Sequence, residues 1–328
     1  MGPDIPSSIR SLLLLTNPSS RRATEVRRQL ESCISGLDAS IQVTWKDVFQ
    51  TAEHDSEVDR AVIVGGDGTV NLGLSWLNQA GIRAPVALIP AGTGNNLARG
   101  LGLPLEASEA IKVAFCTLTT RHVDAIGLSC DGARTGMMLQ VAATGMPAYV
   151  ASRFDRLRHL PLLSYPIRWI GDSFYRLLAL QAIATNKNRN FKWNLNLDGE
   201  VLEVCGAALF FGNEGTIGGG FTPCPRARID DGLLDVCLLP TLSFRKTLQL
   251  FKQVSNGTHL KDRDDIFYRQ CRTVQLKQAP CPFLVDGDIR GNPAKIELEC
   301  LPGIVELVLP EITRSGQQNQ AVAGSEPS

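Results

Sequence analysis

The stretch Ala61–Asn71, AVIVGGDGTVN, constrains the fold more than any other part of this sequence. It begins with four apolar residues, AVIV, and such a run is typical of a strand buried in a parallel sheet. A glycine-rich turn follows at 65–69, and residues 70–79 continue with a helical pattern. Glycines let a ligand approach the backbone, and free N–H groups at a helix start attract negative charge. We therefore expect an α/β region with an anion-binding turn.

The aspartate inside this turn, Asp67, limits the kinds of reaction that the turn could support. A carboxylate beside phosphates repels them unless a cation bridges the two groups or the carboxylate acts as a base. Asp67 therefore favours a Mg²⁺-dependent phosphoryl-transfer site over a passive phosphate cradle. The simpler alternative is an aspartate that caps a helix in a tight turn, and the pentapeptide alone leaves that alternative open.

A second unit of the same kind follows about 25 residues later. Residues 86–90 form another apolar run, residues 91–96 another glycine-rich turn, and a helix is expected from Leu97. The carboxyl ends of parallel strands share one edge of the sheet, where α/β proteins bind ligands. The two turns are thus expected to lie together.

GGDGTVN at 65–71 and PAGTGNNLAR at 90–99 resemble the diacylglycerol kinase catalytic-domain superfamily, which includes sphingosine kinases and soluble bacterial lipid kinases. The resemblance covers roughly residues 10–310. Supporting matches occur in the same order: Asn17-Pro18-Ser19, Val123-Asp124, Asn213 with Gly218-Gly219-Gly220, Asp230-Asp231-Gly232-Leu233 and Asp286-Gly287-Asp288. The resemblance implies a kinase that uses ATP and Mg²⁺ to phosphorylate a lipid hydroxyl, most simply diacylglycerol to phosphatidate, with a sphingosine-type or other lipid as alternative.

The resemblance also implies a set of nucleotide contacts in the first part of the chain: Asn17, Gly65, Gly66, Asp67, Gly68, Thr69, Asn71, Gly92, Thr93, Gly94 and Asn95. A late DGE motif supplies the base in soluble bacterial members, and here it reads Asp286-Gly287-Asp288. Either Asp286 or Asp288 could take the proton from the lipid hydroxyl, so the expected catalytic residues are Asp67, Asp286 and Asp288. Asp-Gly is also a hairpin-turn signal, and both roles are compatible.

Some family members bind a structural Mg²⁺ through a DDG segment. Carried over, Asp231 would be the ligand, with the carbonyls of Arg228 and Leu233, and Asp124 and Asn96 would be the partners in the first domain. Asn96 replaces an acidic residue of the family, which weakens this network. A second departure is Leu72, where the family usually has Glu near the nucleotide.

The pattern of the chain changes near residue 122. Strands alternate with helices before it, whereas strand-like pieces follow. Turn signals such as Asp131-Gly132, Asp198-Gly199 and Asp286-Gly287 separate several of these pieces. These pieces are 122–130, 135–144, 179–185, 192–197, 202–211, 233–239, 272–278, 282–286, 294–299 and 303–309. The predicted fold is an α/β nucleotide-binding domain with a parallel sheet (1–121), a mostly antiparallel β-sandwich domain for the lipid (122–312), an active site in the cleft between them, and a disordered tail (313–328).

Composition excludes several other classes. The net charge is zero, so no overall field favours nucleic acid. The nine cysteines are scattered and form no CxxC pair, which favours reduced thiols in a cytoplasmic protein over disulfides or a zinc site. No apolar run is long enough for a transmembrane helix. The oligomeric state stays open, with a homodimer as one option.

Residues 151–176 carry a net charge of about plus three among apolar and aromatic residues, which suits peripheral contact with an anionic membrane. A helix packed on the sandwich with a solvated basic face is the favoured alternative. Two rival functions also remain: another GGDG enzyme, such as an NAD-kinase-like or phosphofructokinase-like protein, and a non-catalytic lipid- or nucleotide-binding homologue, for which Leu72, Asn96 and Asp288 argue.

Overall fold

The computed structural model describes residues 5–18, 21–53, 57–92, 94–158, 178, 181, 190–217, 221–261 and 263–310. Thr93, the GGG segment 218–220, the tail 313–328 and most of residues 151–176 lie outside the described residues. The predicted strand 179–185 also lies outside them except for Gln181, which is helical.

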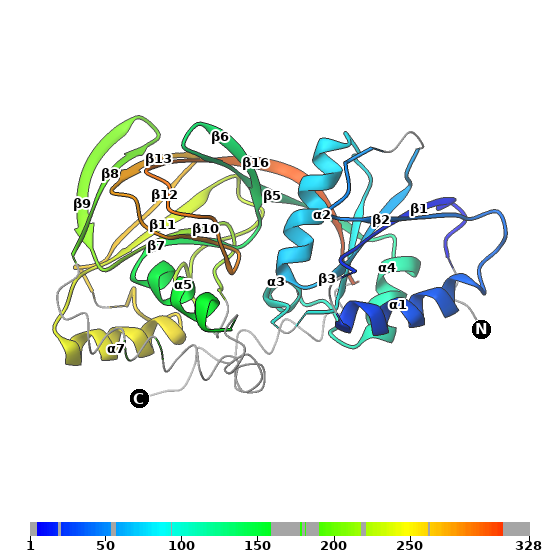
Figure 1. Ribbon diagram of the computed structural model, residues 1–328, viewed down its shortest axis with the longest axis horizontal. Helices are drawn as coiled ribbons and strands as arrows, with labels where there is room; N and C mark the ends of the chain where they lie inside the picture. Colours follow the sequence, from blue (N-terminus) through cyan, green and yellow to red (C-terminus); the bar gives the residue numbers. More distant parts are fainter. Residues whose placement is uncertain are drawn as a thin grey trace.

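The first part of the chain is a parallel sheet covered on both faces (Figure 1). Its strands are ordered β2 (Gln42–Asp47), β1 (Ser11–Thr16), β3 (Arg60–Gly65) and β4 (Val86–Pro90). Alternate residues of these strands pack against α1 (Arg21–Ile34) and α4 (Ala107–Cys116) on one face and against α2 (Asp67–Gln79) on the other. Burial on both faces explains why β1 and β3 are almost entirely apolar. The predicted α/β region is confirmed.

The second part consists of two stacked sheets whose strands pair antiparallel with one another (Figure 1). The first sheet continues from β4 through β16 (Lys295–Val308), β13 (Thr273–Gln278), β8 (Phe191–Leu197) and β9 (Glu200–Gly206), and β5 (Thr120–Cys130) and β6 (Ala133–Met138) branch from β16. The second sheet is ordered β12 (Phe267–Cys271), β11 (Leu234–Leu239), β10 (Ala208–Gly212), β7 (Val141–Gly145), β14 (Phe283–Val285) and β15 (Asp288–Ile289). An apolar core fills the space between the sheets. The predicted antiparallel β domain is confirmed.

Two helices cover the outer face of the second sheet: α5 (Met146–Arg158) and α7 (Phe244–Ser255). A short helix, α3 (Asn96–Gly100), follows the second glycine-rich turn. In the part of the chain that the structure describes, no helix is long and apolar enough to cross a bilayer.

Strand β16 joins the two parts. Its first residues pair with β13, its whole length pairs antiparallel with β5, and Leu307 near its end pairs parallel with Val86 of β4. The predicted boundary at 121/122 falls inside β5. The large sheet therefore runs without interruption from one part to the other.

Several predicted element bounds were wrong, each for a local reason. The predicted strand 135–144 is divided into β6 and β7, because the carboxylate of Asp286 binds the backbone N–H groups between them. The predicted strand 202–211 is divided after Gly206, where a Cβ would lie 2.5 Å from the carbonyl oxygen of Leu239. The pieces 294–299 and 303–309 form one strand with a bulge. Helix α7 and strand β12 were not predicted.

Candidate active site

The two glycine-rich turns touch each other, backbone against backbone. A Cβ on Gly66 would lie 2.9 Å from the Cα of Gly92, and a Cβ on Gly92 would lie 2.5 Å from the Cα of Gly66. The N–H of Ala91 also donates to the carbonyl of Gly65 at 2.9 Å. Only glycine fits at either contact, so this close approach fixes both turns as one unit at the edge of the parallel sheet.

The second turn is closed by its own asparagine. Asn95 has a left-handed backbone, with φ of 50°. Its side-chain oxygen accepts the N–H of Gly92 at 2.9 Å, and its side-chain nitrogen donates to the carbonyl of Gly92 at 3.1 Å. The guanidinium of Arg22 donates to the same carbonyl at 2.9 Å. Asn95 therefore shapes the turn, because its polar side chain replaces local backbone partners.

Asp67 links the first turn to the second. One of its carboxylate oxygens accepts the N–H of Asn96 at 3.1 Å and the Asn96 amide at 3.3 Å, and the other accepts the N–H of Leu97 at 3.0 Å. Asp67 thus satisfies free N–H groups at the start of α3, which is a neighbouring helix and not its own. The capping interpretation is compatible with the geometry, and it leaves the carboxylate beside both turns.

Asp286 enters the same region from the second part of the chain. Its carboxylate accepts the N–H groups of Leu139, Gln140 and Val141 at 3.0–3.1 Å and the amide of Asn71, on α2, at 3.2 Å. The residue is partly exposed, but burial around its carboxylate raises the pKa of Asp286 to about 7. The three backbone donors lower this pKa and the nearby Asp67 carboxylate raises it.

Asp288 lies two residues further on and is exposed. A Cβ on Gly68 would lie 3.0 Å from a carboxylate oxygen of Asp288, so this carboxylate sits directly over the first glycine-rich turn. The turn at 286–288 thus brings the Asp288 carboxylate to the surface of the first glycine-rich turn and holds the Asp286 carboxylate against Asn71 of α2.

Glu214 is an acidic residue near this site that the sequence analysis missed. Burial raises the pKa of Glu214, and Asp67 adds to the upward shift. Its carboxylate accepts the N–H and hydroxyl of Thr216 and lies 3.1 Å from where a Cβ on Gly100 of α3 would be. The sequence signal was its position directly after Asn213, a matched family residue. The Asp67 carboxylate repels the carboxylates of Glu214 and Asp286, and a bound cation relieves repulsion of this kind.

The predicted structural-metal residues are divided between two places. Asp124 is buried, and its two oxygens accept the N–H groups of Gly232 and Gly303, each at 2.7 Å. Asp231 lies close enough that, after burial, Asp124 is among the causes that raise the pKa of Asp231. Asn96 instead bonds to Asp67 in the glycine-turn unit.

Few ligands are available for a cation beside Asp124 and Asp231. The carboxylates of Asp124 and Asp231 both accept hydrogen bonds already. Asp124 is buried and Asp231 is exposed, so Asp231 stays the predicted carboxylate ligand, with the chain carbonyls of Arg228 and Leu233 as the predicted additional ligands. Within the described residues, no three His, Cys, Asp or Glu side chains are grouped to hold a metal. The structural Mg²⁺ site stays a prediction.

The remaining predicted nucleotide residues lie around the two turns. Thr69 is buried directly against Gly65, where an added Cβ would lie 2.4 Å from the Cβ of Thr69. Asn17 follows β1 at the same edge of the sheet, and Gly94 lies against Asn96 and Asp67. Thr93 is outside the described residues.

A polar hollow extends from Asn71 along α2 and is closed by the second part of the chain. Its walls are Asn71, Leu72, Ser75, Asn78, Gln79, Arg134, Thr135, Gly136, Met137 and Arg290. The two arginines are its charged side chains, and Nε of Arg290 is buried without a hydrogen-bond partner. Such guanidinium groups suit phosphate oxygens. Neither arginine was predicted from the sequence as a site residue.

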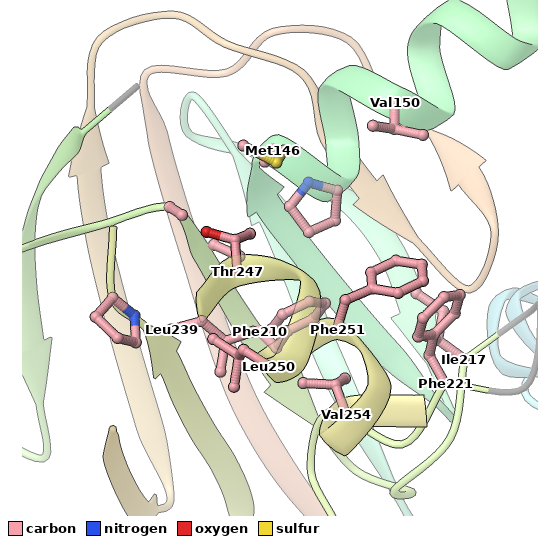
Figure 2. A pocket seen from close by; sticks show the side chains of 14 residues that line it. Met146, Val150, Phe210, Ile217, Phe221, Leu239, Thr247, Leu250, Phe251 and Val254 are labelled. Atoms are coloured by element: carbon pink, nitrogen blue, oxygen red, sulfur yellow. The ribbon is translucent and has the colours of Figure 1, made fainter. Parts of the chain in front are cut away.

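A second, apolar pocket lies between the outer face of the second sheet and helices α5 and α7 (Figure 2). It encloses about 800 Å³ of space, part of which is open to solvent. Its labelled walls in Figure 2 are Met146, Val150, Phe210, Ile217, Phe221, Leu239, Thr247, Leu250, Phe251 and Val254. Apart from the Thr247 hydroxyl, these side chains offer no oxygen or nitrogen, so the pocket suits a hydrocarbon group.

Comparison with known proteins agrees with this arrangement. The profile of the diacylglycerol kinase catalytic domain matches residues 11–128, and that of the YegS C-terminal NAD kinase beta sandwich-like domain matches residues 140–309. A diacylglycerol kinase of Mycobacterium tuberculosis (strain H37Rv) is 30% identical over 253 residues, covering 77% of each chain. A "Probable lipid kinase YegS-like" of Pseudomonas aeruginosa (strain UCBPP-PA14) is 32% identical over 238 residues, covering 69% of this chain and 68% of that protein.

A solved structure of a diacylglycerol kinase from Bacillus anthracis superimposes with a TM-score of 0.63 at 19% identity, covering 93% of this chain and 99% of that one. Yeast NADH kinase superimposes with a TM-score of 0.53 at 12% identity, which is a likeness of fold alone. The matched catalytic domain and the Mycobacterium relative show that the chain is a kinase. The chain belongs to the diacylglycerol kinase catalytic-domain superfamily.

Proposed function

We propose that this kinase transfers the γ-phosphate of ATP, in the presence of Mg²⁺, to the hydroxyl of a lipid, with diacylglycerol as the first candidate and phosphatidate as its product. The observation that carries the proposal is the position of the Asp288 carboxylate over Gly68. A base at this position would lie next to the γ-phosphate and the attacking hydroxyl if the phosphates bind at this turn.

The nucleotide phosphates would bind the joined turns at 65–69 and 91–95. The N–H groups at the start of α2 supply a positive dipole end there. Arg134 and Arg290, in the hollow next to Asn71, would add positive charge toward the same polyphosphate. Mg²⁺ bound to the phosphates neutralises charge that develops on transfer. Asp67 and Glu214 are the carboxylates whose repulsion such a cation relieves.

Asp288 is the better candidate for the base. Its carboxylate is exposed and faces Gly68, whereas both oxygens of Asp286 are already occupied by four donors. We therefore assign proton abstraction from the lipid hydroxyl to Asp288 and assign Asp286 a positioning role. Asp286 ties α2, through Asn71, to the segment 139–141, so it holds the two walls of the site at a fixed separation.

The apolar pocket supports a lipid as acceptor. Strand β7 runs from Val141, whose N–H binds Asp286, to Gly145, and the pocket wall begins with the next residue, Met146. Five strand residues span roughly 15–17 Å. An acyl chain held in the pocket would therefore leave a glycerol-sized head group within reach of the 286–288 turn.

The decisive experiment is transfer of labelled γ-phosphate from ATP to a mixed lipid extract, with and without Mg²⁺. Wild-type protein should label one lipid, and Asp67→Ala should label none. Glu203→Gln, at an exposed position of β9, is the folded control. Phosphorylation of NAD⁺ with no labelled lipid would replace the proposal with an NAD-kinase-like activity. ATP binding without transfer to any acceptor would replace it with a non-catalytic binder.

A further inference from the structure

The outer face of α7 carries large apolar side chains in contact with solvent. Phe244 is 44% exposed and Leu248 is 41% exposed. They are four residues apart, so they form one stripe on the helix surface. An adjacent side of the helix is anchored by Leu250 and Val254, which are buried. Helix α7 therefore packs on the protein through Leu250 and Val254, and the apolar side chains of Phe244 and Leu248 are not needed to fill the core.

Basic side chains lie beside this stripe. Arg245 and Lys252 are both exposed and are seven residues apart, so they share one line along the helix next to Leu248. No ion pair joins either of them to another residue in the described part of the chain. The helix sequence, FRKTLQLFKQVS, contains no acidic residue. The exposed face thus combines an apolar stripe with unpaired positive charge.

The stripe is continuous with the wall of the apolar pocket. Phe251 lines the pocket, and it lies three residues from Leu248 and seven from Phe244 on the same helical side. In Figure 2 the side chains of Phe251, Leu250 and Val254 extend from α7 around the pocket. An apolar path therefore runs from the solvent-exposed stripe over the edge of α7 to the pocket interior.

We propose that the exposed face of α7 docks on the surface of an anionic phospholipid bilayer, so that the stripe enters the acyl boundary and the pocket opens toward the lipid. This inference rests on the proposed lipid substrate. Charge complementarity selects the partner: unpaired Arg245 and Lys252 match acidic head groups, while Phe244 and Leu248 match the hydrocarbon beneath them. The surface differs from residues 151–176, which were the candidate for membrane contact from the sequence, although a packed helix with a solvated basic face was the favoured interpretation there.

The test is co-sedimentation with two vesicle preparations, phosphatidylcholine alone and phosphatidylcholine mixed with phosphatidylglycerol, at low and high salt. Wild-type protein should bind the mixed vesicles, and binding should weaken as salt screens the charges. The double variant Phe244→Ser/Leu248→Ser should bind both preparations about tenfold more weakly. Arg245→Gln/Lys252→Gln should lose about tenfold on mixed vesicles only and should lose the salt dependence.

Matched controls lie on other surfaces of the protein. Val201 on β9 is 70% exposed, so Val201→Ser removes an apolar side chain that is more accessible than Phe244 or Leu248. Lys192→Gln/Lys277→Gln removes two exposed lysines of β8 and β13. Equal losses in these controls would overturn the assignment to α7. The assignment would also be overturned if wild-type protein bound neither vesicle preparation. The same holds if the Phe244→Ser/Leu248→Ser variant bound as tightly as wild type.

Kinetic measurements separate this inference from the proposed function. With a short-chain diacylglycerol dispersed in detergent, the α7 variants should retain wild-type turnover, because none of the four altered residues lies in the pocket wall or at the two turns. With the lipid in mixed vesicles, their turnover should fall in parallel with binding. A protein that binds vesicles through α7 but phosphorylates no lipid would contradict the proposed function and leave the docking surface in place.

Discussion

Two hairpin turns in this protein have nearly the same sequence and backbone but different surroundings. The first joins β8 to β9 through Asp198-Gly199, and the second joins β14 to β15 through Asp286-Gly287. Asp198 and Gly199 have φ of 51° and 96°, and Asp286 and Gly287 have φ of 46° and 91°. In both turns the aspartate carboxylate accepts backbone N–H groups of a neighbouring segment. Both turns are therefore two-residue connections that require positive φ at each position.

The difference between them lies in what each turn faces. Asp198 caps the exposed start of β13, and Glu200 after it forms a 2.8 Å ion pair with Arg269 on the surface. Asp286 meets Asn71 of α2, and Asp288 after it meets Gly68. The first turn reads DGE, the family motif for the base, whereas the second reads DGD. The contacts of each carboxylate therefore depend on the segment that lies across the turn and not on the tripeptide itself.

The residue after each turn should give the largest contrast. Asp288→Asn removes the proposed base and should lower kcat by about 10²–10⁴-fold, while the unfolding free energy stays near that of wild type because the side chain is exposed. Glu200→Gln should leave kcat unchanged. Turnover of purified variants on the lipid identified above measures both. A fully active Asp288→Asn enzyme would remove Asp288 from the mechanism.

Replacing the turn aspartates should separate positioning from stability. Asp286→Asn places an amide donor against backbone N–H groups, so it should cost about 1–3 kcal/mol of unfolding free energy and also reduce turnover. Asp198→Asn disturbs similar bonds at an exposed turn and should lower stability alone. Urea unfolding and kinetics on both variants provide the test. Reduced turnover in Asp198→Asn would mean that the effect spreads through the sheets.

The contributions of Asp286 and Asp198 to the unfolding free energy should depend on pH in opposite directions. The folded pKa of Asp286, about 7, is above its unfolded value near 3.9, so its contribution lowers stability as pH rises from about 4 to 7, by at most about 1.4 kcal/mol per unit. Partial burial acts to raise the pKa of Asp198, but hydrogen bonds from Arg272 and Thr273 outweigh it and the net pKa is lowered.

Asp198 therefore stabilises the fold above its unfolded pKa, and this contribution is lost as pH falls below about 4. Unfolding free energies of wild type, Asp286→Asn and Asp198→Asn across pH 3–8 measure both contributions. The Asp286→Asn variant should lose the decline between pH 4 and 7. An unchanged decline would assign it to other groups.

The smallest effects should come from the turn glycines. Gly199 and Gly287 both have positive φ and open space where a Cβ would go, so Ala at either position should cost about 1 kcal/mol through backbone strain alone. The stability losses should match, whereas Gly287→Ala alone should also reduce turnover, because a shift of this turn moves Asp288. Equal turnover in the two variants would mean that the 286–288 turn tolerates movement.

Local sequence patterns predicted much of the fold of this protein. The apolar runs of β3 and β4 predicted the parallel sheet, because burial on both faces leaves a continuous signal in the sequence, and the glycine-rich turns predicted which of its edges binds a ligand. The Asp-Gly pairs at 198 and 286 identified hairpins for a similar reason, since few residues accept positive φ. These features depend on neighbouring residues alone.

Features that depend on distant contacts were not predictable. The division of β6 from β7 requires Asp286, which is 145–147 residues away from the N–H groups it binds. Arg134 and Arg290 form a common hollow only after the two parts of the chain meet. The sequence likewise could not choose between Asp286 and Asp288, because both are acidic and only the surrounding donors distinguish them.

The path of β16 has a consequence for how the protein is made. This strand is the last described element to leave the ribosome, and it pairs with β4 and along the whole of β5, which are synthesised more than 150 residues earlier. During translation these early strands have an exposed edge that their own neighbours in sequence do not cover. The nascent chain therefore completes its first sheet only after β16 has been synthesised, and a truncation before Lys295 should leave the parallel sheet prone to associate through that edge.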